Sequence, residues 1–121
     1  MCSLKWGLDL HPFIEAYIAT ALWADFPEDA AENAELSVEA KGAMVKDATL
    51  FLNENMDLLN LTPEDYDYGN AGLDFWLTRN GHGAGFWDGG CGIVGVDLTA
   101  KADEYPHQDL YVGDDGLIYI Q

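Results

Sequence analysis

Basic side chains are scarce in this sequence. Five lysines and arginines face 22 aspartates and glutamates in 121 residues, which gives a formal net charge of −17 at pH 7. A charge of about 2 to 8 in magnitude is enough to keep a small domain in solution. The excess opposes direct binding to nucleic acid or to an anionic membrane and favours basic proteins as partners. Acidity without any role in binding is the alternative interpretation.

Cysteines and long apolar runs are also few. Cys2 and Cys91 are the two cysteines, and Cys91 lies in the apolar, glycine-rich segment DGGCGIVGV with no basic neighbour to activate its thiol. The first residues, MCSLKWGLDL, lack the basic start and apolar run of a signal peptide. No apolar run approaches the roughly 20 residues that span a bilayer. We therefore expect a cytoplasmic protein with reduced thiols.

The first 70 residues carry helical patterns. Asp9 or His11 can cap a first helix that has Pro12 in its opening turn and runs to about Trp23. Its predicted apolar face consists of Phe13, Tyr17, Ile18, Ala21 and Leu22.

A second and a third helical segment follow in the same half. The acidic stretch EDAAENAELS is either a helical turn or a loop. Ser37 is a good N-cap for a longer helix to about Leu59, and residues 62–65 (TPED) predict a short third turn.

The pattern changes from Asp74 onward. The runs DFWLT and GFWD are aromatic and β-prone on either side of RNGHGAG, which predicts a hairpin with a long loop. Residues 97–104 predict a short helix, and DLYVGDDGLIYI predicts a second hairpin around GDDG. The expected fold is α+β in the order α-α-β-β-α-β-β, with two to three N-terminal helices packed on a small antiparallel sheet of two hairpins. We expect one domain, 1–121, in which 1–70 is mainly helical and acidic and 71–121 is an aromatic, glycine-rich hairpin region.

Residues 77–90, LTRNGHGAGFWDGG, are the stretch that most resembles a ligand-binding or catalytic site. Its glycines follow a G-x-G-x-G spacing, but a predicted strand follows them instead of a helix, which argues against a phosphate loop. Metal-binding spacings such as H-x-x-x-H and C-x-x-C are absent. The acidic run at 65–69 lacks the spacing of a calcium loop. We expect no cofactor and no metal.

A catalytic interpretation of the same stretch centres on His82. Asp74 or Asp88 can orient its ring as a base, Thr78 is a weak nucleophile, and Arg79 can stabilise negative charge. The favoured alternative is that the glycines only turn the chain while the aromatic side chains pack against the helices.

The run GLDFWLTRNGHGAGFWDGG, together with the terminal LYVGDDGLIYI, resembles a family of small, uncharacterised proteins common in bacteriophages and other mobile elements. The family signature is similar to DFWLTRNGHGAGFWD followed by a C-terminal YVGDDG hairpin. The resemblance covers about residues 71–120 and carries no established activity. It implies a phage or prophage protein that works in the cytoplasm of a bacterial host cell.

The acidic residues are concentrated in the helical half. Fourteen of the 22 lie between Asp9 and Asp67, opposed only by Lys41 and Lys46. Carboxylates on exposed helix faces can imitate duplex DNA, which presents one charge per about 1.7 Å of axis. We therefore expect a DNA-mimic inhibitor without enzymatic activity. Its expected partner is a host DNA- or RNA-binding defence protein with a basic groove, as in an anti-CRISPR or anti-restriction role.

Nine residues are expected to bind the partner, namely the two densest acidic stretches and one aromatic: Glu28, Asp29, Glu32, Glu35, Glu39, Glu64, Asp65, Asp67 and Trp87. Two alternative functions stay open. One is a protein-interaction module that uses the aromatic hairpin, with Phe75, Trp76, Phe86 and Trp87. The other is a small hydrolase or transferase centred on His82. The target and the oligomeric state are left open.

Overall fold

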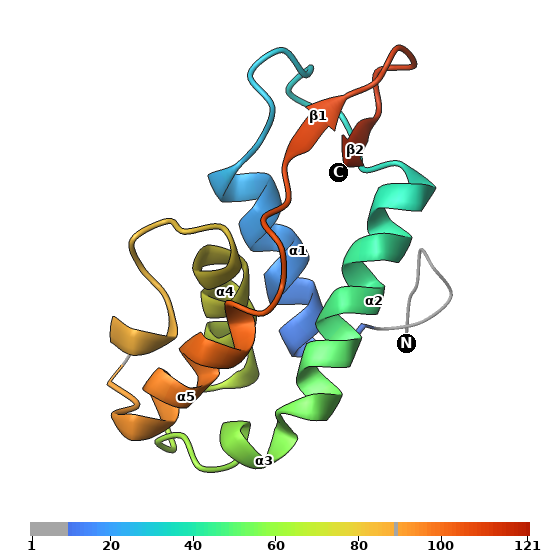
Figure 1. Ribbon diagram of the computed structural model, residues 1–121. Coiled ribbons are helices and arrows are strands. Elements are labelled where there is room, and N and C mark those ends of the chain that lie inside the picture. Colours follow the sequence, from blue (N-terminus) through green and yellow to red (C-terminus); the bar gives the residue numbers. More distant parts are fainter. Residues whose placement is uncertain (1–9, 89) are drawn as a thin grey trace.

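The computed structural model describes residues 10–88 and 90–121, and Figure 1 shows the arrangement of the helices and strands. The described elements are α1 (Pro12–Ala24), α2 (Val38–Glu54), α3 (Met56–Leu59), α4 (Tyr68–Arg79), the 3-10 helix η1 (Phe86–Asp88), α5 (Ile93–Ala102), β1 (Leu110–Val112) and β2 (Ile118–Ile120). The predicted α+β class is confirmed. The helices make up most of the fold, and the two strands form one small antiparallel sheet.

Helix α1 begins as the sequence predicts. The Nδ1 atom of His11 accepts a hydrogen bond from the Phe13 amide at 3.1 Å, and Pro12 occupies the first turn, where its missing N–H is not needed. Helix α1 packs closely along α4. A Cβ atom at Gly72 of α4 would overlap the carbonyl oxygen of Phe13, so this close approach depends on glycine.

The second predicted helix is divided in two. Its N-cap is confirmed, because Ser37 Oγ accepts from the Ala40 amide at 3.0 Å. The predicted continuation to about Leu59 is wrong, since α2 ends at Glu54 and α3 starts at Met56. The side chain of Asn55 donates to the Phe51 carbonyl at 3.0 Å, a local bond that competes with helix continuation at this position.

The first predicted hairpin is wrong. Residues 74–78 (DFWLT) lie in α4, and Phe86 and Trp87 lie in η1, so the sheet contains two strands instead of four. Asp67 caps α4 by accepting from the Asn70 amide at 2.8 Å. Packing against α1 buries one side of α4, and this tertiary contact outweighs the β propensity of a short aromatic run.

Two smaller elements also differ from expectation. Residues 62–65 form no helix; a single turn is closed there by a hydrogen bond from the Tyr66 amide to the Pro63 carbonyl at 2.9 Å. Helix α5 begins at Ile93 instead of Asp97, after Gly92 with a φ of 61°.

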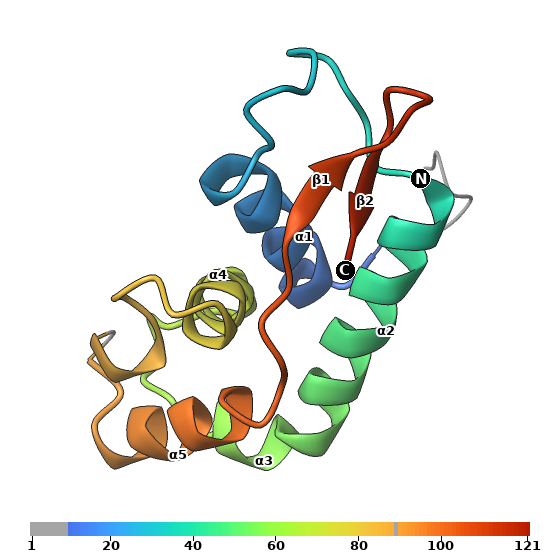
Figure 2. The same cartoon turned by 45° about the horizontal axis from the view of Figure 1, so that its top comes forward.

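The C-terminal hairpin is confirmed. Strands β1 and β2 pair antiparallel, with Tyr111 opposite Tyr119. A parallel bridge joins Leu36, just before α2, to Ile118 of β2. Figure 2 shows the hairpin lying over the start of α2, beside the loop that connects α1 with α2.

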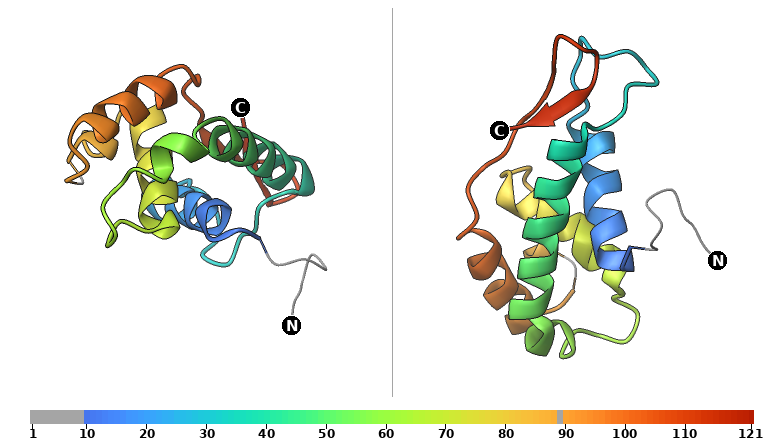
Figure 3. Two further views of the ribbon diagram at one scale, coloured as in Figure 1. Left: turned by 90° about the horizontal axis from the view of Figure 1, so that it is seen from below. Right: turned by 90° about the vertical axis from the view of Figure 1, so that its right-hand side faces the viewer.

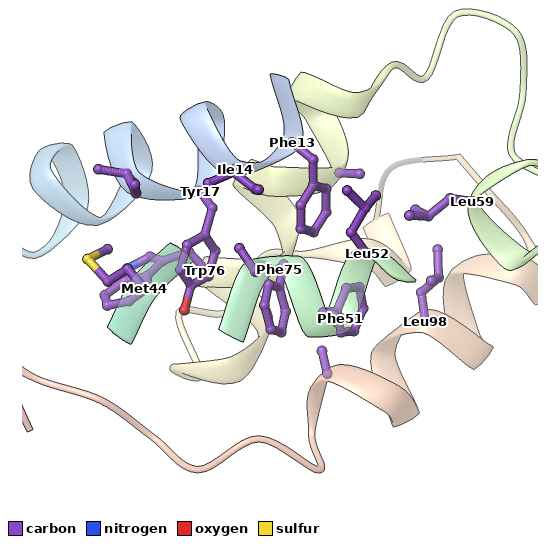
Figure 4. Close-up of a cluster of buried hydrophobic side chains, with 14 of the residues drawn as sticks. Phe13, Ile14, Tyr17, Met44, Phe51, Leu52, Leu59, Phe75, Trp76 and Leu98 are labelled. Atoms are coloured by element: carbon purple, nitrogen blue, oxygen red, sulfur yellow. The ribbon is translucent and has the colours of Figure 1, made fainter. Parts of the chain in front are cut away.

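The core lies between α1, α2 and α4. Helices α1 and α2 run side by side and antiparallel (Figure 3). Figure 4 shows the rings of Phe13, Phe51 and Phe75, one from each of these helices, gathered at its centre. The centroids of the Phe51 and Phe75 rings are 4.0 Å apart. No helix in the described residues is long and apolar enough to cross a membrane.

Candidate functional site

The first acidic stretch lies in a loop and not on a helical surface. Residues 25–37 connect α1 to α2 through two turns, closed by hydrogen bonds from Ala30 N to the Pro27 carbonyl at 3.2 Å and from Ala34 N to the Ala31 carbonyl at 2.9 Å. The stretch lacks the apolar period that would bury one side of a helix. The expectation that these acids lie on an exposed helical face is therefore wrong for all but Glu39, which is in the first turn of α2.

Backbone hydrogen bonds fix this acidic loop to the C-terminal hairpin. The Ile118 amide donates to the Glu35 carbonyl at 2.9 Å, and the Ser37 amide donates to the Ile118 carbonyl at 2.8 Å. The loop and the turn of the hairpin consequently lie at the same end of the molecule (Figures 1 and 2). We call this region the acidic end. It carries seven exposed acidic side chains: Glu28, Asp29, Glu32, Glu35, Glu39, Asp114 and Asp115.

The hairpin and the first turn of α2 interact electrostatically at Tyr119. The Tyr119 hydroxyl donates to Asp115 Oδ2 at 2.7 Å. This hydrogen bond raises the pKa of Tyr119 to about 12, and the negative charge of Glu39 adds to the rise. The same hydrogen bond lowers the pKa of Asp115 from its ordinary value. Asp115 is therefore held in its charged form.

The second acidic cluster is separate from the first. Glu64, Asp65 and Asp67 lie in the connection between α3 and α4, at the opposite end of α2 from the acidic end (Figure 1). Helix α2 has 17 residues, which corresponds to a length of about 25 Å. Asp67 is also the N-cap of α4. The structure thus does not bring the two predicted stretches together.

The glycine-rich loop turns the chain after α4. The Gly81 amide donates to the Thr78 carbonyl at 3.2 Å, and the His82 amide donates to the Leu77 carbonyl at 3.1 Å. Gly81 has a φ of 65°, as glycines that end helices commonly do. Only the three-residue helix η1 follows, so its amides do not form the helix N-terminus of a phosphate loop. These contacts support the turn interpretation of the loop.

A carboxylate that contacts His82 is that of Asp25, at the end of α1. Its Oδ2 atom lies 2.8 Å from His82 Nε2 and accepts a hydrogen bond from Trp76 Nε1 at 2.6 Å. The predicted partner Asp74 is instead buried and accepts from the Tyr66 hydroxyl at 2.6 Å. Residue 74 lies in α4 and not on the predicted strand. The side chain of Asp88 lies outside the described part of the structure.

Thr78 and Arg79 are buried and already engaged. Thr78 Oγ1 accepts from the Phe86 amide at 3.3 Å. Arg79 donates to Asp47 Oδ2 at 3.0 Å and to the Tyr17 hydroxyl at 2.9 Å. Thr78 and Arg79 are thus held by contacts inside the fold, and none of these hydrogen bonds involves His82.

Buried hydroxyl and thiol groups are kept in their protonated forms. Burial raises the pKa of Tyr17 to about 12, although the nearby Arg79 opposes the rise. Burial, and then the hydrogen bond to Asp74, raise the pKa of Tyr66. Burial also raises the pKa of the Cys91 thiol, with a contribution from Asp74. Cys91 is consequently a poor nucleophile at neutral pH.

Most of the aromatic residues considered for binding lie in the core. Phe75, Trp76 and Phe86 are fully buried, whereas 46% of Trp87 is exposed. Trp23 of α1 is 76% exposed. Trp23 and His82 line an open hollow of about 470 Å³. The aromatic surface available to a partner thus includes Trp23 and Trp87.

The contact between Asp25 and His82 could not be predicted from the sequence. Asp25 and His82 are 57 residues apart, and no local pattern links them. The outward position of Tyr111 and Tyr119 did have a signal, because the alternation in LYV and IYI places each tyrosine on the opposite face of the strand from its apolar neighbours.

No group of three or more histidine, cysteine, aspartate or glutamate side chains within residues 10–88 and 90–121 is placed to hold a metal ion. Comparison with protein-family models, with curated proteins and with solved structures gives no match for this chain.

Proposed function

We propose that the protein is an acidic inhibitor that binds the basic nucleic-acid groove of a host defence protein, in an anti-CRISPR or anti-restriction role, and that the acidic end makes the principal contact. The observation that carries the proposal is the backbone pairing of Glu35 and Ser37 with Ile118, which fixes the acidic loop beside the hairpin. The sequence has no lysine or arginine between Lys5 and Lys41 or after Lys101. The segments that form the acidic end therefore contain no lysine or arginine.

The arrangement suits a competitor of nucleic acid in two ways. Clustered carboxylates attract a basic groove over about 8 to 10 Å at physiological salt, and this attraction speeds the encounter of the two proteins. Loop segments that are hydrogen-bonded before binding lose less conformational entropy when the partner docks. Because the second acidic cluster lies at the far end of α2, we propose that it extends the contact only in a groove long enough to follow this helix.

Electrophoretic competition tests the proposal. A purified restriction endonuclease and an RNA-guided nuclease are each bound to labelled duplex DNA, and the protein is titrated in at low and at physiological salt. We expect it to displace DNA from at least one of the two enzymes, and less effectively at the higher salt concentration. Displacement that does not respond to salt would contradict an electrostatic mechanism.

A matched pair of variants separates the acidic end from total charge. The test variant combines E28Q, D29N, E32Q and E35Q in the acidic end. The control variant combines E54Q, D57N, D97N and E104Q, exposed acids that lie outside the acidic end. Both variants remove four negative charges. We expect the test variant to lose displacement and the control to retain most of it, and equal effects would show that the acidic end has no special role.

A second candidate function rests on the exposed aromatic side chains. Trp23 and Trp87 are large rings in contact with solvent, and such residues often dominate protein interfaces. If they make the main contact, W23A and W87A will weaken partner binding at every salt concentration, and the charge variants will have little effect.

A further inference from the structure

The outer face of the C-terminal hairpin carries a pair of stacked tyrosines. Tyr111 and Tyr119 lie directly opposite each other in the register of β1 and β2. Their ring centroids are 5.8 Å apart, with an angle of 25° between the ring planes. On the other face of the hairpin, Leu110 and Ile120 pack against the core. The tyrosines therefore have no place in the core, and 42% of Tyr111 is exposed.

The turn of the hairpin closes one side of this pair and forms a cleft. The ring of Tyr119 packs so closely over Gly113 that a Cβ atom there would overlap it. Asp115 holds the ring in place, because it accepts from the Tyr119 hydroxyl at 2.7 Å and from the Leu117 amide at 3.0 Å. Asp114 completes the lining of an open cleft of about 360 Å³.

The lining selects for a cation. Aromatic ring faces attract positive charge, and two aspartates at the rim repel anions. Arginine suits such a place better than lysine, because its planar guanidinium stacks on a ring while its N–H groups reach a carboxylate. The lysine ammonium is a compact, strongly hydrated charge that gains less from the ring.

We propose that the tyrosine cleft, lined by Tyr111, Gly113, Asp114, Asp115 and Tyr119, binds an arginine side chain on the surface of a basic partner. The guanidinium lies on the exposed face of Tyr111, with its N–H groups toward the two aspartates. The proposal rests on the proposed function only for the nature of the partner, since a groove built for nucleic acid is rich in arginine.

Two peptides of equal charge test the cleft. Nona-arginine and nona-lysine are titrated into the protein at physiological salt, and the ratio of their dissociation constants is measured by calorimetry. The variants are Tyr111→Leu, which removes the aromatic face, and Tyr111→Phe, which keeps it. Leu61→Ala serves as a control at an exposed side chain outside the cleft, and thermal melting followed by circular dichroism confirms that each variant is folded.

We expect the protein to favour nona-arginine, and Y111L to reduce that preference by about two- to fivefold, the range that an exposed cation–π contact supplies. Y111F and L61A should keep it. If folded Y111L retains the full preference, or if Y111F loses as much as Y111L, the cleft does not act through the tyrosine ring.

The outcome is independent of the proposed function. The variant E28Q/D29N/E32Q/E35Q should weaken both peptides and leave their ratio unchanged, because it spares the cleft. If neither nuclease is displaced from DNA but the arginine preference still depends on Tyr111, the cleft stands and the proposed target is wrong. If a nuclease is displaced and Y111L changes nothing, the cleft proposal fails alone.

Discussion

Arg79 offers the sharpest test of the structure, because the sequence suggested a role in catalysis and the fold places it in the core. Only 5% of the residue is exposed. Its guanidinium donates to Asp47 at 3.0 Å, to the Tyr17 hydroxyl at 2.9 Å and to the Pro106 carbonyl at 2.6 Å. The perturbation is Arg79→Met, which keeps a long side chain of similar reach but donates no hydrogen bond.

The expected loss follows from the acceptors left behind. A buried acceptor that loses its donor costs about 1–3 kcal/mol, and breaking a buried ion pair by removing one partner costs about 3–5 kcal/mol. The Asp47 side chain is 25% exposed and can regain some water. The loss should therefore lie at the lower end, about 3 kcal/mol in the free energy of unfolding. That is a large part of the roughly 5–15 kcal/mol that stabilises a typical domain.

Urea unfolding measures this loss. Trp76 is fully buried, so its fluorescence reports on the core. The control is Lys46→Met, an exposed cation of the same helix as Asp47, for which we expect a change within about 0.5 kcal/mol. A double-mutant cycle with Asp47→Asn should give a coupling of about 0.5–3 kcal/mol. If R79M loses less than about 1 kcal/mol in the free energy of unfolding, the guanidinium does not hold α1, α2 and the segment after α5 together.

Three other predictions follow from burial, close packing and charge. The free energy of unfolding should fall as pH rises through 10 toward 12. Burial raises the pKa of Tyr17 to about 12 in the folded state, whereas the unfolded chain releases this proton near pH 10. Urea titrations at pH 8, 10 and 11 would show the fall, and a free energy that does not change with pH would contradict the prediction. Gly72→Ala should destabilise the protein, since its Cβ atom would overlap the Phe13 carbonyl, whereas Gly42→Ala, where no atom lies within 4 Å of the added Cβ, should stabilise α2 by about 0.5–1 kcal/mol. Thermal melting compares the two variants, and a Gly72→Ala variant at least as stable as the native protein would mean that α1 and α4 do not approach closely at Gly72. Added sodium chloride should raise the melting temperature, and the E28Q/D29N/E32Q/E35Q variant should melt at a higher temperature than the native protein at low salt. Both changes reduce the repulsion between negative charges within the acidic end. An unchanged melting temperature would mean that these charges are too dispersed to repel one another.

Local signals account for the parts of the fold that could be predicted. Ser37 and His11 cap their helices as the sequence indicates, and the GDDG turn lies between two strands. The run DFWLT could not be assigned in the same way, because a run of five residues with the apolar stretch Phe75, Trp76 and Leu77 fits a strand as well as a buried helix. A local signal for the helix is Asp67, a cap that lies seven positions before Asp74, and packing against α1 then favours the helix over a strand.

The candidate site was less predictable because tertiary contacts create it. The density of acids between Glu28 and Glu39 is visible in the sequence, but their position beside the hairpin depends on the pairing of Glu35 and Ser37 with Ile118. The contact between His82 and Asp25 likewise exists only because α1 packs along α4. Composition can indicate the chemistry of such a surface, whereas its assembly requires the fold.

Variants of the acidic end also test whether its negative charge serves binding or has no role. Seven like charges on two segments held together by hydrogen bonds repel one another, so the arrangement destabilises the folded state. Neutralising four of them should then stabilise the protein. If the same four substitutions also abolish DNA displacement, stability and binding respond in opposite directions, as they do at sites where function opposes stability. A gain in stability with displacement intact would instead mean that the acidic end is not where the nucleic-acid groove is bound.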